Sequence, residues 1–128
     1  GVKTIMKLEK ETQAKSAVVP VGAENFEEMV LKATLPVIVD FSADWCPPCR
    51  VLAPLYAKLG QEYTGKVRFA SLDADDEATL SIQARYGIQG LPTLIIFHQG
   101  NPIAWMVGPH PARLKATIAH ELEQHNLL

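Results

Sequence analysis

A nearly continuous apolar run at residues 36–42 is the feature that most constrains the fold of this chain. It reads Pro-Val-Ile-Val-Asp-Phe-Ser, without the alternation of apolar and polar positions expected of a half-exposed strand. A strand with this pattern is covered on both faces, as are the central strands of sheets flanked by helices. The run therefore predicts a buried central strand in an α/β domain, and its one charged member, Asp40, is conspicuous.

Strand and helix patterns alternate along the rest of the chain, which is typical of an α/β domain. Further strands are expected at residues 17–20, 66–72, 93–98 and 103–107, with a hairpin turn at 99–101. Apolar residues at helical spacing predict helices at about 26–33, 47–63, 76–87 and from 111 onward. Pro54 lies inside the second helix, where we expect a kink rather than a stop. The predicted order is β-α-β-α-β-α-β-β-α.

The 128 residues suffice for one compact domain. We expect this domain at residues 17–128, and at 1–16 a polar, lysine-containing arm that is mobile or docks as a short helix. The net charge of −2, with both signs interspersed, gives no basic stripe and argues against nucleic acid as a partner. Nothing indicates an obligate interface, so a monomer is expected.

Two absences in the sequence bear on the compartment without deciding it. No apolar run approaches the roughly 20 residues that a membrane span requires. The chain begins at Gly1 and shows no signal peptide, and we expect a cytoplasmic protein. A periplasmic or exported protein is the alternative if a leader has been removed.

Cys46 and Cys49 are the only cysteines. A crosslink across so short a loop removes little entropy from the unfolded chain, and a domain of this size needs no such staple. A C-x-x-C pair also supplies half of many zinc sites, but the four histidines show no spacing that would complete one. The pair is therefore interpreted as a redox-active dithiol, and no metal site is expected.

The position of the cysteines indicates how they would react. Cys46 follows the buried strand after a short turn and begins a helix, whose N–H groups and dipole stabilise a thiolate. It is the predicted nucleophile, and Cys49, one turn further and expected to be more buried, is the predicted resolving thiol. Pro47 and Pro48 hold the bend and remove two backbone donors, so the Cys49 N–H is the first available to the Cys46 sulfur.

Three other positions complete the predicted site. Asp40, without a partner on a buried strand, should have a raised pKa and accept the Cys49 proton; a capping or salt-bridged aspartate is the alternative. A cis bond before Pro92 would turn the backbone of Leu91 toward the cysteines as an edge for an extended peptide, although trans is the commoner state. Trp45 is either an apolar contact surface beside Cys46 or a partly buried core aromatic.

Several motifs together resemble the thioredoxin family, in the right order and at the right separations. They are Val39-Asp40-Phe41, Ala43-Asp44-Trp45-Cys46-Pro47-Pro48-Cys49-Arg50, Ala53-Pro54 and Tyr86-Gly87-Ile88-Gln89-Gly90-Leu91-Pro92-Thr93-Leu94. The resemblance extends over roughly residues 18–126. It implies a thioredoxin fold, with a central mixed sheet of four or five strands flanked by helices.

The resemblance also implies a function, the reduction of protein disulfides by Cys46 and Cys49. Asp40 would be the buried acid, Pro92 would be cis opposite the dithiol, and Gly108 would border the substrate groove. No cofactor would be bound, because electrons would come from a thioredoxin reductase or, for an exported protein, from a membrane-bound reductant. The alternatives are an exported disulfide oxidase or isomerase and a peptide-binding holdase of the same fold.

Three positions depart from the usual family pattern. The family usually has Gly in place of Pro47, Trp in place of Ser42 and Lys in place of Ser71. That lysine neighbours the buried acid, so its absence predicts a still higher pKa for Asp40. The departures also weaken the expectation that an ordinary thioredoxin reductase uses this protein efficiently.

Overall fold

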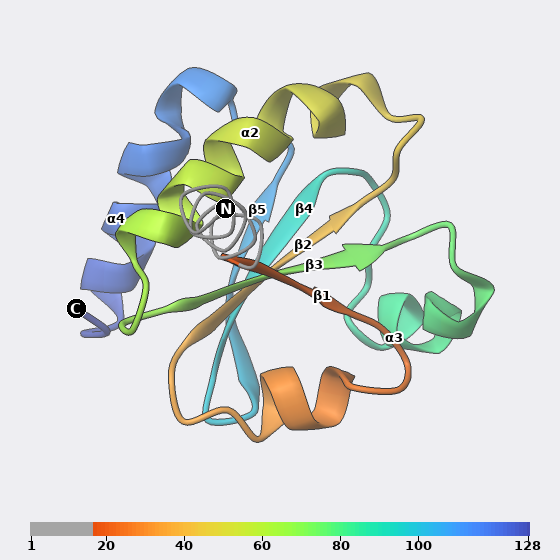
Figure 1. Ribbon diagram of the computed structural model, residues 1–128, viewed down its shortest axis with the longest axis horizontal. Coiled ribbons are helices and arrows are strands. Elements are labelled where there is room, and N and C mark those ends of the chain that lie inside the picture. The colour runs from red at the N-terminus through yellow and green to blue at the C-terminus, as the bar shows by residue number, and fades with distance from the viewer. Residues whose placement is uncertain (1–16) are drawn as a thin grey trace, which may run out of the picture.

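A five-stranded mixed sheet forms the centre of the molecule (Figure 1). The computed structural model describes residues 17–128; the arm predicted at residues 1–16 lies outside the described residues. The strands lie in the order β1-β3-β2-β4-β5, in which β1, β3 and β2 are parallel and β4 and β5 antiparallel to their neighbours. Their bounds are Val18–Val21 (β1), Val37–Ser42 (β2), Arg68–Asp73 (β3), Thr93–His98 (β4) and Asn101–Val107 (β5).

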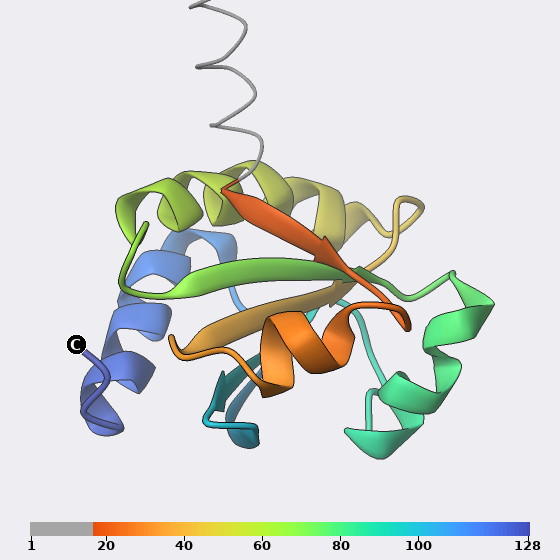
Figure 2. The ribbon, with the colours of Figure 1, turned by 60° about the horizontal axis from the view of Figure 1, so that its bottom comes forward.

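Helices cover both faces of this sheet (Figure 2). On one face lie α2 (Pro47–Glu62) and α4 (Leu114–Gln124), and on the other lie the π-helix η1 (Glu27–Leu31) and α3 (Leu80–Arg85). The short 3₁₀ turns η2 (Glu77–Thr79) and η3 (Pro111–Arg113) lead into α3 and α4. The predicted α/β thioredoxin fold is therefore confirmed. None of the helices in the described part of the chain is both long and apolar enough to cross a membrane.

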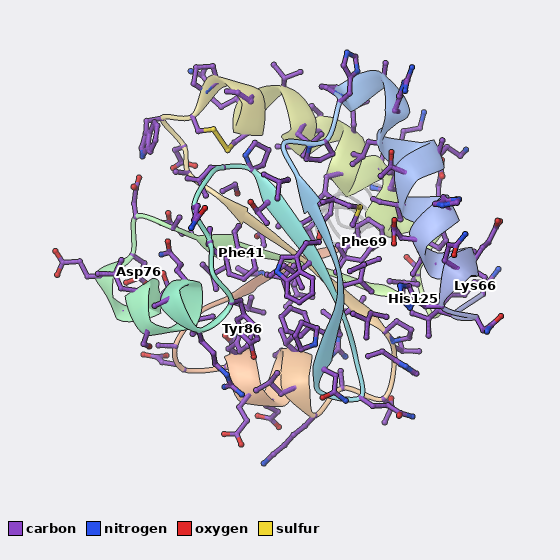
Figure 3. The ribbon with its side chains drawn as sticks, turned by 180° about the vertical axis from the view of Figure 1, so that it is seen from behind. Phe41, Lys66, Phe69, Asp76, Tyr86 and His125 are labelled. Atoms are coloured by element: carbon purple, nitrogen blue, oxygen red, sulfur yellow. A yellow bond between two sulfur atoms is a disulfide. The ribbon has the colours of Figure 1, made fainter. Side chains whose placement is uncertain are left out.

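Two apolar cores lie on opposite sides of the sheet, because successive strand residues point to opposite faces. Ile38 packs with Phe69 and the apolar residues of α2 and α4, whereas Phe41 belongs to the cluster beneath η1 and α3. Phe41 and Phe69 mark the two clusters in Figure 3. Asp40 is two residues after Ile38 on the same strand, so its side chain lies on the same face, which α2 covers. The buried run at residues 36–42 is thus covered on both faces, as predicted.

Local details of three elements differ from the sequence-based expectation. The hairpin turn consists of two residues, Gln99 (φ 53°) and Gly100 (φ 83°), so Asn101 begins β5. Two consecutive residues with positive φ suit the twist of a tight hairpin. The first helix has π-helical spacing, and the helix expected at 76–87 divides into η2 and α3. Helix α2 continues past Pro54, as expected.

Candidate functional site

Cys46 and Cys49 form a disulfide where α2 begins, seen as the yellow bond in Figure 3. Their Cα atoms are 5.2 Å apart. Cys46 is the N-cap residue, with extended backbone (φ −84°, ψ 109°), and Pro47 and Pro48 are the first two residues of the helix. The buried strand β2, a short turn and α2 therefore place the pair at the predicted position.

One backbone donor reaches the sulfur of Cys46. The N–H of Cys49 donates to the Cys46 Sγ at 3.4 Å. Pro47 and Pro48 have no N–H to offer, so Cys49 is the first donor, as predicted. A helix N-terminus favours negative charge, and after reduction this geometry therefore favours a thiolate at Cys46.

The two cysteines are almost equally buried in the disulfide form. Cys46 is 4% exposed and Cys49 is 3% exposed, so the greater burial expected for Cys49 is not seen. Both belong to a small apolar cluster with Ala43, against which Leu91 packs. The physical reason is the S–S bond itself, which holds Cys46 against the same neighbours as Cys49.

The loop before β4, at Leu91 and Pro92, lies beside the dithiol; we call it the Leu91 wall. The Leu91-Pro92 bond is cis, and the carbonyl oxygen of Leu91 lies 3.9 Å from the Cys46 Sγ. The N–H of Gly108 donates to the carbonyl oxygen of Pro92 at 2.9 Å, which joins this loop to the end of β5. Gly108 has a φ of 55°, in the left-handed region that favours glycine. The structure thus brings Leu91, Pro92 and Gly108 together beside the cysteines.

Trp45 lies at the surface beside Cys46. Its side chain is 65% exposed, and its Nε1 donates to the Asp75 Oδ1 at 2.9 Å. The alternative of a core aromatic is therefore wrong, and the indole offers an apolar surface held in place by one hydrogen bond. Sequence reasoning gave Asp75 no role in the site, and the residue that caps η2 is Asp76. It also missed Val107, which is 70% exposed next to Gly108.

Asp40 is buried without a partner on the α2 side of β2. It is 3% exposed, and within residues 17–128 its side chain makes neither a hydrogen bond nor an ion pair. Burial raises its pKa from 3.8 to about 7, in the direction predicted. The alternative of a capping or salt-bridged aspartate is therefore wrong. Burial, and to a lesser extent the charge of Asp40, raises the pKa of Tyr56, which packs on the same face.

Comparison with known proteins decides the family. A sequence model of the family described as Thioredoxin matches residues 17–120. The chain belongs to the thioredoxin family. A protein of Synechocystis sp. named thioredoxin is 42% identical over 110 residues, which are 86% of this chain and 98% of the relative. The thioredoxin of Haemophilus influenzae is 33% identical with the same coverage of both chains. A chloroplastic M-type thioredoxin of Brassica napus is 38% identical over 81% of this chain and 56% of its own length.

Family membership and the disulfide at Cys46 and Cys49 define the activity class. This thioredoxin-family protein is a thiol-disulfide oxidoreductase, of the class that reduces protein disulfides. Proteins of this family need no prosthetic group. Within residues 17–128, no cluster of three or more His, Cys, Asp or Glu side chains is placed to hold a metal ion.

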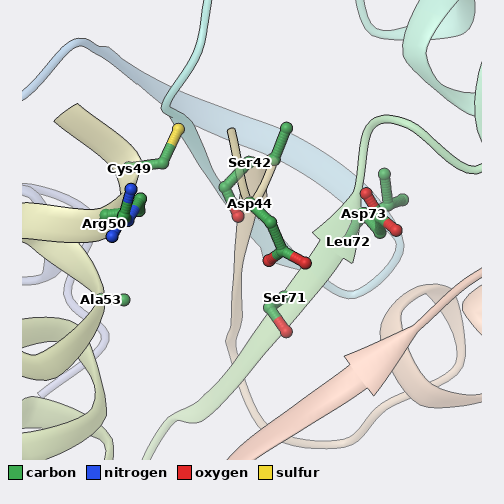
Figure 4. Close-up of a pocket in the computed structure, with 9 residues that line it drawn as sticks. Ser42, Asp44, Cys49, Arg50, Ala53, Ser71, Leu72 and Asp73 are labelled. Carbon is green, nitrogen blue, oxygen red and sulfur yellow. The ribbon is translucent and has the colours of Figure 1, made fainter. Parts of the chain in front are cut away.

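Two of the three departures from the family pattern meet in one pocket. The pocket has a volume of about 200 Å³ and opens beside Cys49 (Figure 4). We call it the serine pocket, after Ser42 and Ser71. Its lining comes from the end of β2 and the turn after it, from α2 and from β3: Ser42, Ala43, Asp44, Cys49, Arg50, Ala53, Ser71, Leu72 and Asp73.

Proposed function

We propose that this thioredoxin-family protein reduces disulfides in extended segments of other proteins, with Cys46 as the nucleophile and Cys49 as the resolving thiol. The observation that carries the proposal is the position of the Cys46 Sγ. It accepts the Cys49 N–H at the start of α2 and lies 3.9 Å from the carbonyl oxygen of Leu91. One sulfur is therefore next to both a group that favours its thiolate and a backbone edge for a substrate.

The reaction has two exchange steps. The Cys46 thiolate attacks a substrate disulfide, forms a mixed disulfide and releases the first substrate sulfur as a thiolate. Cys49 then attacks the Cys46 sulfur, which forms the internal disulfide and releases the second substrate thiolate. Asp40 accepts the proton of Cys49 in this step, because a carboxyl group with a pKa of about 7 can take up and release protons near neutral pH.

The substrate segment lies along the wall beside the dithiol. The backbone of Leu91 provides hydrogen-bonding groups for an extended peptide, and Pro92 and Gly108 shape the groove. Trp45, which directly precedes Cys46, provides an exposed apolar surface. Pro47 and Pro48, both exposed, complete the contact surface in front of the disulfide.

The reductant is a second protein. Each turnover leaves the protein oxidised, so a partner must return two electrons to Cys46 and Cys49. We propose a flavin-dependent thioredoxin reductase in the cytoplasm, and a membrane-bound reductant if the protein acts in an exported compartment. The monomer remains our expectation for the oligomeric state.

The equilibrium reduction potential of the Cys46/Cys49 pair tests this function. Titration against glutathione and dithiothreitol buffers should give a value near that of thioredoxin, about −270 mV. A value between about −120 and −180 mV would instead indicate an oxidase or isomerase and overturn the proposal. As a matched pair, Cys49→Ser should accumulate a mixed disulfide with a protein substrate, whereas Cys46→Ser should not.

The double variant Cys46→Ser, Cys49→Ser tests the peptide-binding alternative. A reductase loses its activity in this variant and has no separate ability to prevent client aggregation. Full client protection without either cysteine would show that binding, rather than thiol chemistry, is the main function.

A further inference from the structure

Three side-chain oxygen groups without partners lie on the α2 face of the sheet. Asp40 and Ser42 are two residues apart on β2, so they point to the same face. Ser71 is the parallel register partner of Asp40 on β3. Among residues 17–128, none of these three side chains makes a hydrogen bond to protein, and the Oδ1 of Asp40 is fully buried.

The serine pocket opens two of these three side chains to solvent. Ser42 and Ser71 line it, and its outer lining includes the exposed residues Asp44, Arg50 and Ala53. A volume of about 200 Å³ holds several water molecules, each of which occupies about 30 Å³ in the liquid. A buried water needs two to four polar partners, and a serine hydroxyl both donates and accepts. The pocket therefore supplies both space and polar partners for water next to Ser71, the register partner of Asp40.

We propose that the serine pocket is a proton port, in which water held by Ser42 and Ser71 carries the proton between Asp40 and bulk solvent. The inference rests on the proposed function, in which Asp40 accepts the proton of Cys49. Ser42 and Ser71 are positioning residues in this port, because they act on Asp40 through water and touch no reacting sulfur.

The location of the port matters while substrate is bound. In the mixed disulfide, the substrate covers the surface around Trp45, Leu91 and Pro92. None of the residues proposed to contact substrate lines the serine pocket. The proton of Cys49 therefore has a route to solvent that bound substrate leaves open.

The proton balance of the resolving step is complete. Cys49 gives its proton to Asp40, and its sulfur forms a bond to the Cys46 sulfur as the bond from Cys46 to substrate breaks. The electron pair of that broken bond leaves with the substrate thiolate, which solvent protonates. Asp40 then returns its proton to solvent through the water in the port, so that it is ionised for the next cycle.

The charged and titratable groups around Asp40 allow a clear test. From α2, Tyr56 interacts electrostatically with Asp40, and Cys49 lines the pocket. The register partner on β4 is the apolar Leu94, and the pocket lining also carries Asp44, Arg50 and Asp73. These last three side chains are exposed and are screened by solvent and salt. Changes at Ser71 therefore alter access to Asp40 without removing a charge.

The decisive variants are Ser71→Leu, which fills the port, and Ser71→Thr, which keeps the hydroxyl. The matched control is Ser81→Leu, at an exposed position of α3. Release of substrate thiol from a preformed Cys46 mixed disulfide is followed by stopped flow between pH 6 and 9. The titration of the Asp40 carboxyl carbon is followed by NMR in the oxidised protein.

We expect Ser71→Leu to slow release about tenfold at pH 6.5 and to move the Asp40 titration about one pH unit higher. The rates should converge near pH 9, where Asp40 is ionised in both proteins. Ser71→Thr should behave like the parent, as should Ser81→Leu. Formation of the mixed disulfide by Cys46 should be unchanged, which a general loss of structure would not allow.

An unchanged release profile in folded Ser71→Leu would overturn the port. If that variant does not fold, the double variant Ser42→Ala, Ser71→Ala leaves the pocket open but without hydroxyls. We expect it to release substrate at least about threefold more slowly at pH 6.5, and equality with the parent would overturn the proposal. Failure of the parent itself to form a Cys46 mixed disulfide would instead reject the proposed function, while the Asp40 titration would still test the port.

Discussion

The carboxyl group of Asp40 is placed where its ionised form is least favourable. It has no hydrogen bond or ion pair within the described part of the chain, and 97% of its surface is buried. Desolvation disfavours the charge, so its pKa rises from 3.8 to about 7. The site therefore holds an acid that changes protonation state near neutral pH, at a cost in stability.

Replacing Asp40 should raise the free energy of unfolding wherever its carboxyl group is ionised. The pKa of Asp40 is 3.8 in the unfolded chain and about 7 in the folded protein. The stability that the neutral carboxyl group allows is therefore fully present below pH 3.8 and is lost as the pH rises through about 7. The difference corresponds to about 4 kcal/mol. We expect Asp40→Asn to stabilise the oxidised protein by up to this amount above pH 7 and to have little effect near pH 4.

Urea unfolding of the oxidised protein at several pH values measures this effect. The control Asp44→Asn removes an exposed carboxyl group nearby and should change stability little at any pH. A parent protein whose stability does not fall relative to Asp40→Asn between pH 4 and pH 8.5 would show that Asp40 is not held neutral by burial.

The proline at position 48 limits the hydrogen bonds that Cys46 receives. An N-cap side chain accepts from the second or third helical residue, here Pro48 or Cys49, and only Cys49 has an N–H. Pro48→Ala restores the missing donor, so we expect reduced Cys46 to be alkylated about two- to threefold faster at pH 7. Pro47→Ala is the control, because the first helical N–H does not reach the cap. Equal rates for the two variants would show that the missing donor is unimportant.

At the scale of elements, α2 connects the dithiol to the sheet by close packing. Gly60, near the end of α2, lies where a Cβ would be 3.0 Å from the carbonyl oxygen of Ala17 and 3.3 Å from the Cβ of Phe69. Tyr56, one turn earlier, places its hydroxyl 3.0 Å from the carbonyl oxygen of Ile38 and 2.8 Å from that of Ala70. These contacts hold α2, which carries Cys49, against β2 and β3.

Gly60→Ala sets two opposing effects against each other. Alanine is favoured over glycine inside a helix by up to about 1 kcal/mol. The added Cβ, however, meets a backbone oxygen and a strand Cβ, neither of which moves easily, and overpacking of this kind costs about 1–3 kcal/mol. We therefore expect a net loss of about 1 kcal/mol in the free energy of unfolding, measured by urea titration. Gly22→Ala, where nothing lies within 4 Å of the new Cβ, is the matched control, and a stabilised Gly60→Ala would contradict the tight packing.

At the scale of the whole molecule, exposed apolar side chains flank the buried dithiol. Trp45 at the end of the β2 turn and Val107 at the end of β5 are 65% and 70% exposed. The hydrogen bond from Gly108 to Pro92 joins the end of β5 to the Leu91 wall. Large exposed apolar side chains gathered around a reactive group are typical of a protein-binding surface.

A charge at position 107 should weaken substrate binding at this surface. We expect Val107→Asp to lower kcat/KM for a protein disulfide about five- to tenfold and to leave the reduction of a small disulfide unchanged. Leu80→Asp is the control, because Leu80 is also exposed (56%) but lies on α3. Equal losses with protein and small disulfides would place the effect on the dithiol itself instead of on the binding surface.

Local patterns in the sequence determined the element order, the buried run at residues 36–42 and the cysteine pair at a helix start. These are properties of neighbouring residues: apolar periodicity, proline positions and the C-x-x-C spacing. The burial of Asp40 followed from its place in the run. The two-residue hairpin turn, the π-helix and the division of the third helix were not predicted, because propensities fix the boundaries of elements only loosely.

Only the tertiary structure decided which distant residues meet. Leu91 follows Cys46 by 45 residues and Asp75 follows Trp45 by 30, and both contacts depend on strand order and register. The register of β2 against β3 likewise places Ser71 beside Asp40 and opens the serine pocket next to Cys49. A local pattern predicts that Asp40 is buried. Whether a hydrogen-bonding or charged side chain contacts it depends on how the strands and α2 pack together.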